Sequence, residues 1–363
     1  MTHPYRNRPA TSFWRRSVAD RPWSDVTFVE GGRLTLDGNT RIATAGSCFA
    51  SNVLRWLPRL GLRPFFTEVA PSWFTADEAR AHGYGEFAAR YGNIYTVRQL
   101  RQLVEEALGH RPPIEAFDDH AGAVWDLLRP HVRPGGFASV EEARHDRAYH
   151  LRCVERLLRE SDVFVFTLGL TEAWVDDRSG VVFPVCPGTV AGRYDPAHHR
   201  PVNFDHPAVV DDLCWVIDAV AAVNPGLRWI VTVSPVPLVA THGDDHVVVA
   251  STYSKSVLRA ACGAVEAGHP SVTYFPSYEI IASPQSFGQY LASDLREVTD
   301  RGIQHVMRVF ERTFVAASSN PDVAPEPAAS PAHDGPTAAP GLGREAAVAA
   351  ALAGECDELM NDR

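Results

Sequence analysis

The sequence contains almost no lysine. Of its 34 basic residues, Lys255 is the single lysine and all the others are arginines. Arginine stays charged and presents a planar fork, whereas lysine is a compact ammonium whose pKa shifts readily on burial. The one lysine therefore indicates a role that arginine cannot fill, with chance survival as the alternative.

Long apolar runs and paired cysteines are also missing. No stretch reaches the roughly 18 apolar residues that span a bilayer, and the first residues lack the apolar core of a secretory signal. The six cysteines are scattered without a CxxC pair, which argues against a zinc ribbon or a disulfide scaffold. We therefore expect a cytoplasmic protein with reduced thiols and no membrane partner.

The protein carries no excess of positive charge. Its net charge is −10, of which the eight acids and two arginines of residues 316–363 contribute −6. A protein that binds nucleic acid needs a basic face. We therefore expect no nucleic-acid partner.

What the sequence does contain is an alternation of strand and helix patterns. Runs rich in β-branched residues predict buried parallel strands at 41–45, 162–168, 228–234 and 272–276. Helical patterns lie at 52–57, 97–108, 140–160, 208–223, 254–267 and 299–314. This order predicts one three-layer α/β/α domain over residues 1–315, with functional sites at the carboxyl ends of the strands.

Three regions stand apart from this alternation. Residues 65–134 are rich in aromatics and turns and are longer than a simple crossover needs, so we expect an inserted cap over the crevice. Ala, Pro, Ser and Gly dominate residues 316–343, which predicts a disordered linker. Residues 344–360 are rich in alanine and predict a short helix, marginal in water on its own, that is a candidate to bind a protein partner.

The run from Ile42 to Ala50 reads IATAGSCFA, in which an apolar strand stops at a Gly-Ser-Cys and a helical pattern begins. Gly46 can adopt dihedral angles that other residues avoid, which leaves Ser47 facing the crevice beside the amides of a helix. Ser47 is therefore the candidate nucleophile. The alternative is a tight turn in which Ser47 only caps the helix.

Residues 46–50 spell GSCFA, and distinctive loops follow in order at Gly92-Asn93, 167–174 and 234–237. With these motifs the chain resembles the GSCFA family, which is related to the SGNH or GDSL hydrolases, over about residues 10–315. The resemblance implies a flavodoxin-like α/β/α fold. It also implies that Ser47 is the nucleophile and that its own amide helps to bind an oxyanion.

The resemblance assigns further residues around the nucleophile. Gly92, Asn93 and Gly169 take the places of the other oxyanion donors, a kind of group that lowers the barrier of acyl transfer. Glu172 stands where the SGNH pattern has an asparagine, and a carboxylate accepts hydrogen bonds rather than donating them. Lys255 falls on the family's Ser-Lys pair, which weighs against chance survival.

The general base is where the sequence departs most from the SGNH pattern. SGNH hydrolases place it in an Asp-x-x-His loop before the last helix, because serine needs a proton acceptor near neutral pH. The loop here runs from Asp294 to Glu297, with glutamate at the histidine position. His305 in the last helix is the nearest replacement, and packing against the sheet is its alternative role. His242 and His246 are further candidates.

Cys48 offers a second nucleophile, since a thiol at the N-terminus of a helix is readily activated. Neighbouring side chains do not both face the crevice, and the family resemblance favours Ser47. Histidines and aspartates between Asp195 and His206 show no recognisable metal-ligand spacing. We therefore expect no metal and no cofactor.

The expected function is hydrolysis of an acyl ester by an SGNH-like enzyme, through an acyl intermediate on Ser47. The substrate is expected to be a small molecule or a carrier-bound acyl chain. An O- or N-acyltransferase is one alternative, because a cap that excludes water admits another acceptor. A non-catalytic binding module is the other, because Glu297 replaces the usual histidine.

Overall fold

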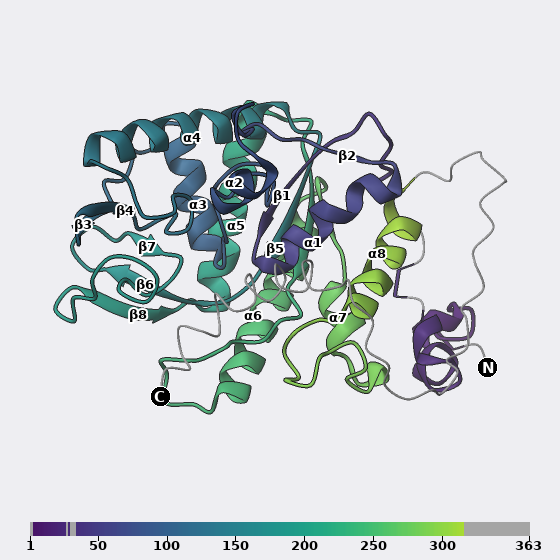
Figure 1. The fold of residues 1–363 in the computed structure, drawn as a ribbon. Coiled ribbons are helices and arrows are strands. Elements are labelled where there is room, and N and C mark those ends of the chain that lie inside the picture. The colour runs from purple at the N-terminus through teal and green to yellow at the C-terminus, as the bar shows by residue number, and fades with distance from the viewer. Residues whose placement is uncertain (1–2, 27, 30–33, 316–363) are drawn as a thin grey trace, which may run out of the picture.

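The centre of the fold is a parallel β-sheet. The computed structural model describes residues 3–26, 28–29 and 34–315, and Figure 1 shows the sheet at the middle of this part of the chain. Its strand order is β10–β9–β5–β1–β2. The strands are β1 (Arg41–Gly46), β2 (Arg63–Pro64), β5 (Val163–Leu168), β9 (Arg228–Val233) and β10 (Val272–Tyr274). The predicted α/β fold with a central parallel sheet is confirmed.

Both faces of the sheet are covered by helices, which explains why the strands lack a polar face. Every residue of β5 is buried. Phe164 and Phe166 pack into the core on one side of the sheet, while Val163 and Val165 pack into the core on the other. Burial on both faces is the usual reason for the continuous apolar runs of parallel strands.

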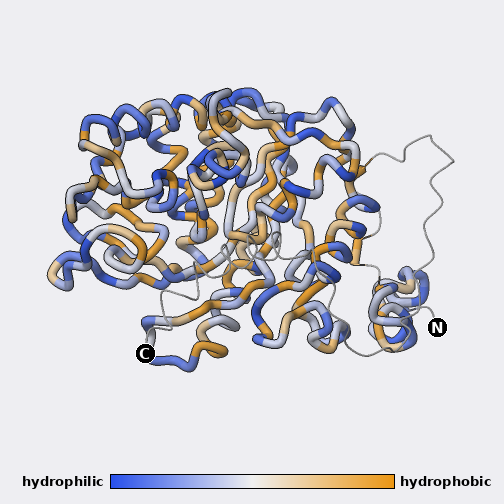
Figure 2. The backbone as a smooth tube through the Cα atoms, viewed as in Figure 1, coloured by the Kyte–Doolittle hydropathy of each residue, from blue (hydrophilic) through white to orange (hydrophobic). Residues whose placement is uncertain are grey.

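The helices form two layers, visible in Figure 1, with the apolar segments gathered between them and the sheet in Figure 2. One layer contains α3 (Val97–Ala107), α4 (Val140–Glu160), α5 (His206–Val223) and α6 (Val247–Gly268). The other contains α1 (Cys48–Trp56), α7 (Ser277–Ala282) and α8 (Asp300–Phe314). Short elements connect them: η1 (Ala10–Ser12), η2 (Arg15–Ala19), η3 (Trp23–Asp25), η4 (Leu57–Leu60), α2 (Ala76–Ala81) and η5 (Pro284–Ser286).

Two helices begin earlier than their sequence patterns predict. The helix expected from residue 52 starts at Cys48, and the one expected from residue 254 starts at Val247. The valines at the start of α6 are β-branched and therefore favour strands over helices. The His246 side chain accepts a hydrogen bond from the amide of Val248 and so caps this end of α6.

Antiparallel strands form beside the main sheet. A hairpin joins β3 (Phe117–His120) to β4 (Ala123–Asp126), and a separate sheet has the order β7 (Val182–Phe183), β6 (Glu172–Asp176), β8 (His199–Asn203). These strands have two to five residues each, too short for a clear sequence signal. The stretch 65–134, for which a cap is predicted, supplies α3 to a helical layer as well as this hairpin. That it acts as a cap stays a prediction.

Several sequence predictions concern residues outside this description. The linker at 316–343 and the helix at 344–360 lie beyond the described residues. Within the described part of the chain, no helix has the length and apolar character needed to cross a membrane.

The strand order places a topological switch point at the end of β1. From β1 the chain adds β2 on one side of the sheet, and then β5, β9 and β10 in turn on the other side. The winding therefore reverses between β1 and β5. Ligands of doubly wound α/β proteins bind at such a switch point, outside the carboxyl ends of the strands.

Candidate functional site

Gly46 ends β1 in a conformation that only glycine adopts easily. Its φ is +138°, and a Cβ at this position would overlap the backbone of Thr167 on β5, with the Thr167 nitrogen at 2.8 Å. The two strands therefore approach too closely here for any side chain. This contact ends the strand abruptly and starts α1 two residues later.

Ser47 occupies the position between β1 and α1 without capping the helix. Its backbone is extended, and its side chain makes no hydrogen bond to the first turn of α1. The hydroxyl is buried and has no hydrogen-bond partner among the described protein groups. Ser47 therefore does not fill the capping role that is the simplest alternative to a chemical one.

Three loops that are distant in sequence meet at Ser47. The amide of Ile94 donates to the carbonyl of Gly46 at 2.8 Å, and the amides of Gly169 and Leu170 both donate to the carbonyl of Tyr95 at 3.1 and 2.8 Å. The segment 93–95 thus lies between the ends of β1 and β5. Three of the loops that carry the sequence motifs, at 46–48, 92–93 and 167–174, are thus next to one another.

Two of the backbone amides expected to bind an oxyanion already have acceptors. The amide of Ser47 donates to the carbonyl of Thr167 at 3.3 Å, and the amide of Gly169 donates to Tyr95. Asn93 is different, because its side-chain oxygen is buried without a protein partner. Gly92 beside it has a φ of +65°. The Asn93 carboxamide therefore keeps one polar atom without a partner among the described protein groups.

Gly169 also packs directly against the serine. A Cβ at Gly169 would lie 3.1 Å from the Cβ of Ser47 and 3.0 Å from the carbonyl oxygen of Tyr95. Both distances are shorter than ordinary carbon contacts. A glycine here leaves the space that the serine side chain occupies.

Lys255 reaches the same place from α6. It is 3% exposed, and its Nζ donates to the carbonyl of Gly169 at 2.8 Å. The neighbouring Ser254 accepts a hydrogen bond from the amide of Thr171 at 3.1 Å, which fixes α6 against the loop after β5. Among the described residues no carboxylate pairs with Lys255. Burial lowers the pKa of Lys255 to about 7, with Cys48 opposing this shift and Arg296 adding to it.

These electrostatic effects identify two further neighbours of the site. Cys48 is half-buried at the start of α1, and its side chain acts on Lys255. Arg296, between α7 and α8, acts on Lys255 with the opposite sign. The structure therefore brings both candidate nucleophiles near the single lysine.

Asp294 and Glu297 lie on the surface, in the loop that replaces the Asp-x-x-His motif. Both are exposed, and the carboxylate of Asp294 accepts the amides of Arg296 and Glu297 at 3.0 and 3.1 Å. Asp294 thus shapes a tight local turn. Of these three residues it is the half-buried Arg296 whose charge acts on Lys255 and lowers its pKa. The sequence pattern of this loop contains nothing that singles out Arg296 as a neighbour of the site.

His305 packs against aromatic and basic residues of its own layer. It is 5% exposed and stacks on Tyr290, with ring centroids 5.1 Å apart. Burial lowers its pKa to about 4, and the charges of Arg308 and Arg312 lower it further. Its Nε2 is buried without a protein partner, as is the Ser47 hydroxyl, so no hydrogen bond joins the two.

Two acids on neighbouring elements have partners of their own. Glu172, predicted near the site, accepts a hydrogen bond from the Thr241 hydroxyl at 2.8 Å and so ties β6 to the loop after β9. Glu279 on α7 accepts from Arg259 at 2.7 Å and from the Tyr274 hydroxyl at 2.8 Å. His242 and His246 lie on that same loop after β9, where His246 caps α6.

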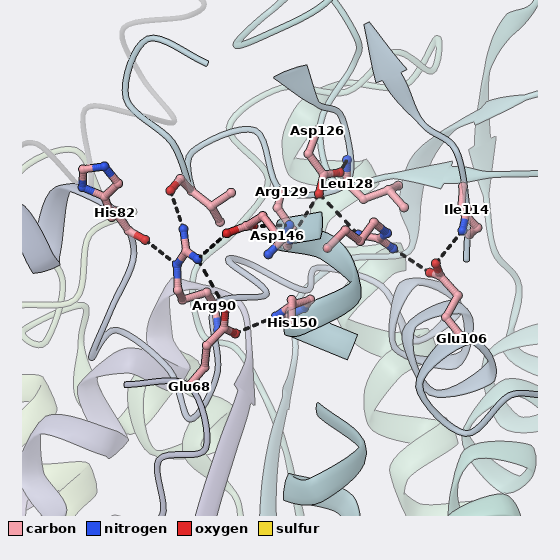
Figure 3. A network of polar contacts seen from close by, with 12 residues as sticks. Glu68, His82, Arg90, Glu106, Ile114, Asp126, Leu128, Arg129, Asp146 and His150 are labelled. Carbon is pink, nitrogen blue, oxygen red and sulfur yellow. Dashed lines mark hydrogen bonds and ion pairs between the residues drawn. The ribbon is translucent and has the colours of Figure 1, made fainter. Parts of the chain in front are cut away.

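A buried network of charges supports the segment that carries Asn93 (Figure 3). Glu68 accepts hydrogen bonds from the amide of Arg90 at 2.8 Å and from His150 at 2.7 Å. Tyr91, next to Arg90, donates its hydroxyl proton to the carbonyl of Thr44 on β1. The rest of the network pairs arginines with carboxylates across α3, α4 and β4: Arg90 with Asp146, Arg129 with Asp126 and Asp146, Arg147 with Glu106 and Asp126.

A small cavity lies between this network and Asn93. Its volume is about 30 Å³, room for one or two water-sized molecules. Asn93, Arg129, Arg147 and His150 are among its lining residues, and each has a buried polar atom without a protein partner. Local sequence patterns do not reveal this network, because its members come from segments that are far apart along the chain.

In the described segments, no group of three or more His, Cys, Asp or Glu side chains is arranged to hold a metal ion. The sequence has no significant match among curated proteins. The model of the GSCFA family matches residues 41–310, which is most of the chain, and the protein therefore belongs to the GSCFA family.

Proposed function

We propose that the protein is an SGNH-like enzyme that cleaves an acyl ester through a covalent intermediate on Ser47. The observation that carries the proposal is the Ser47 hydroxyl. It stands at the switch point of the sheet and neither caps α1 nor bonds any described protein group. A serine without a structural task beside the first turn of a helix is suited to attack a carbonyl whose charge the site can hold.

The developing negative charge requires donors. The side chain of Asn93 has a buried end without a protein partner and can turn its amide group toward the intermediate. The first turn of α1 begins at Ser47 and adds the positive end of the helix dipole. The amide of Ser47 contributes only if its 3.3 Å bond to Thr167 yields to the oxyanion.

Burial of Ser47 bears on the choice between hydrolysis and transfer. Because the hydroxyl is buried, a neighbouring group has to move before a substrate can reach it. When that group closes again over the bound substrate, it excludes bulk water from the site. An acyltransferase that passes the acyl group to an alcohol or amine is therefore the second candidate. For either reaction we propose a small or carrier-bound acyl donor in the cytoplasm.

A non-catalytic binding module is the remaining candidate. It is favoured by the absence of a hydrogen-bonded base on Ser47 within the described chain. The role of the C-terminal segment in binding a protein partner also stays a proposal. The enzyme and the binding module differ in whether a serine-reactive probe will label Ser47.

A fluorophosphonate probe, which phosphonylates activated serines, tests the proposal. We expect the wild type and Cys48→Ala to be labelled and Ser47→Ala to be unlabelled. Ser51→Ala is the matched control, because Ser51 lies one turn further along α1 and its hydroxyl donates to the Cys48 carbonyl at 2.8 Å. Absence of labelling in the wild type favours the binding module. Labelling that survives in Ser47→Ala would contradict the assignment of the nucleophile to Ser47.

For a labelled protein, product analysis then separates the two reactions. Ester substrates of increasing acyl length are incubated with and without alcohol and amine acceptors. Free acid in all samples indicates hydrolysis, whereas a new ester or amide that forms at the expense of the acid indicates transfer.

A further inference from the structure

Lys255 is buried near the proposed nucleophile, and its one hydrogen bond fixes its position without neutralising a positive charge. Its Nζ is held by one neutral acceptor, the carbonyl of Gly169, at 2.8 Å. A buried ammonium ordinarily requires a carboxylate partner, and no described carboxylate supplies one. The surroundings of Lys255 therefore favour the neutral amine, which carries a lone pair.

Ser47 and Lys255 touch the same residue from two sides. A Cβ added to Gly169 would lie only 3.1 Å from the Cβ of Ser47. The Nζ of Lys255 donates a hydrogen bond to the carbonyl of the same glycine. A serine hydroxyl moves between staggered rotamers about its χ1 bond. Catalytic hydrogen bonds are often long before substrate binds and close directly or through one water.

The other candidates for the base lie less favourably. His305 stacks on Tyr290, and the charged groups that act on it are Arg308, Arg312, Asp25 and Arg301. None of these is a neighbour of Lys255. Asp294 and Glu297 are exposed, and Asp294 is occupied by the amides of its own turn.

We propose that Lys255 is the proton acceptor for the Ser47 hydroxyl and fills the place of the histidine that the sequence lacks. This inference rests on the proposed acyl chemistry of Ser47. It also explains why one lysine is present among arginines, because a guanidinium does not release its proton in proteins.

The proton transfers balance over a full cycle. As the Ser47 oxygen bonds to the acyl carbon, its proton moves to the lone pair of Lys255 and the carbonyl electron pair moves onto oxygen. The bond to the leaving alcohol then breaks, and that alcohol takes the proton from Lys255. A water or an acceptor alcohol repeats both steps in the second half and regenerates the serine and the neutral amine.

The protonation of Lys255 can be measured directly because it is the only lysine. Protein labelled with 13C at lysine Cε gives a single side-chain signal, and Lys255→Arg assigns it by its disappearance. The groups that act on this amine are Cys48 on α1 and Arg296 before α8. We expect a titration midpoint near pH 7. A midpoint near 10, the ordinary value for lysine, overturns the inference.

Probe labelling tests the role of the amine. We expect the fluorophosphonate rate of the wild type to rise with pH through the midpoint of the lysine signal. Lys255→Met and Lys255→Gln should lose about 100-fold or more of this rate, the usual contribution of a general base. His305→Gln should keep both the rate and its pH dependence. Thermal unfolding of each variant identifies any that has lost its fold.

The outcomes separate this inference from the proposed function. No labelling of the wild type at any pH overturns both together. Labelling that depends on Ser47 but survives unchanged in a folded Lys255→Met overturns the inference alone. Loss of labelling in His305→Gln with an unaltered lysine titration transfers the role to His305.

Discussion

Gly46 and Thr167 lie so close together that a Cβ on Gly46 would be 2.8 Å from the Thr167 nitrogen. The parallel pairing of β1 with β5 continues to these two residues. The close approach, together with a φ of +138° at Gly46, turns the chain and sets Ser47 between β1 and α1. The position of the proposed nucleophile therefore depends on an unsubstituted Cα one residue before it.

The first prediction concerns this contact. Gly46→Ala should destabilise the protein by about 3 kcal/mol or more, because it combines backbone strain with overlap against a buried strand. Chemical denaturation measures the effect. The control is Gly268→Ala at the end of α6, where an added Cβ meets nothing within 4 Å, and it should be neutral or slightly stabilising. Equal stability of Gly46→Ala and the wild type would contradict the geometry.

The second prediction concerns Gly169. Gly169→Ala places a methyl group 3.1 Å from the Cβ of Ser47 and 3.0 Å from the Tyr95 carbonyl. We expect a loss of about 1–2 kcal/mol of stability from overpacking and a fall of at least about tenfold in probe labelling of Ser47 as the serine is displaced. Gly226→Ala, whose Cβ has only an ordinary 3.7 Å contact with Asn224, is the control. Unchanged labelling would show that this space is not needed.

The third prediction concerns the buried charge network. Arg147 binds Glu106 at 2.7 Å, and the two side chains are 4% and 0% exposed. Arg147→Met leaves a buried carboxylate without its cation, which should cost about 3–5 kcal/mol. Arg156→Met is the matched control on the same helix. Its pair with Glu160 is 58% and 42% exposed, so the cost should stay below about 0.5 kcal/mol.

Denaturation of both arginine variants at pH 7 measures these costs. Equal stability of the two variants would mean that the network contributes no more than a surface ion pair. If Arg147→Met lost much of its stability while Ser47 was labelled as in the wild type, the network would stabilise the fold without affecting the reactivity of Ser47.

The fourth prediction concerns acid sensitivity. Burial lowers the pKa of His305 to about 4, against about 6.5 in an unfolded chain. Between these values the unfolded state binds a proton that the folded state does not, so stability falls as the pH falls. The contribution of His305 is complete above about pH 6.5 and lost toward pH 4. His305→Gln should therefore lose less stability than the wild type between pH 7 and pH 5.

Melting temperatures over this range provide the measurement. His145→Gln on the exposed side of α4 is the control and should follow the wild type. His150, whose pKa is also lowered in the folded state by burial, keeps part of the acid sensitivity in every variant. If the melting temperature of His305→Gln fell with pH as steeply as that of the wild type, His305 would have to be solvated in the folded protein.

Much of the central fold follows from local patterns. The four predicted strands and six predicted helices all appear, and α4 has the predicted bounds, 140–160. The two-residue β2 and the strands of the β6–β8 sheet are absent from the predictions, because so few residues carry no readable period. The α6 start was wrong by seven residues, since cap geometry overrides the strand preference of Val247 to Val249.

The candidate site was only partly accessible to such reasoning. Glycine at 46, serine at 47 and the rarity of lysine at 255 are visible as letters, and the structure brings all three residues together. Arg296 was missed because a turn built by the Asp294 carboxylate decides which residue of that loop faces inward. The roles of Ser47, Asn93 and His305 stay predictions.

The sequence by itself determined the α/β class, the family motif and the turn from strand to helix at Gly46 and Ser47, because apolar periodicity and glycine geometry act over a few neighbouring residues. Only the tertiary structure decided that the amide of Gly169 is taken by Tyr95, that His305 stacks on Tyr290 and that Lys255 is buried with no carboxylate of the described residues beside it. Hydrogen-bond partners and burial depend on residues far apart along the chain, and these contacts exist only after the layers have packed.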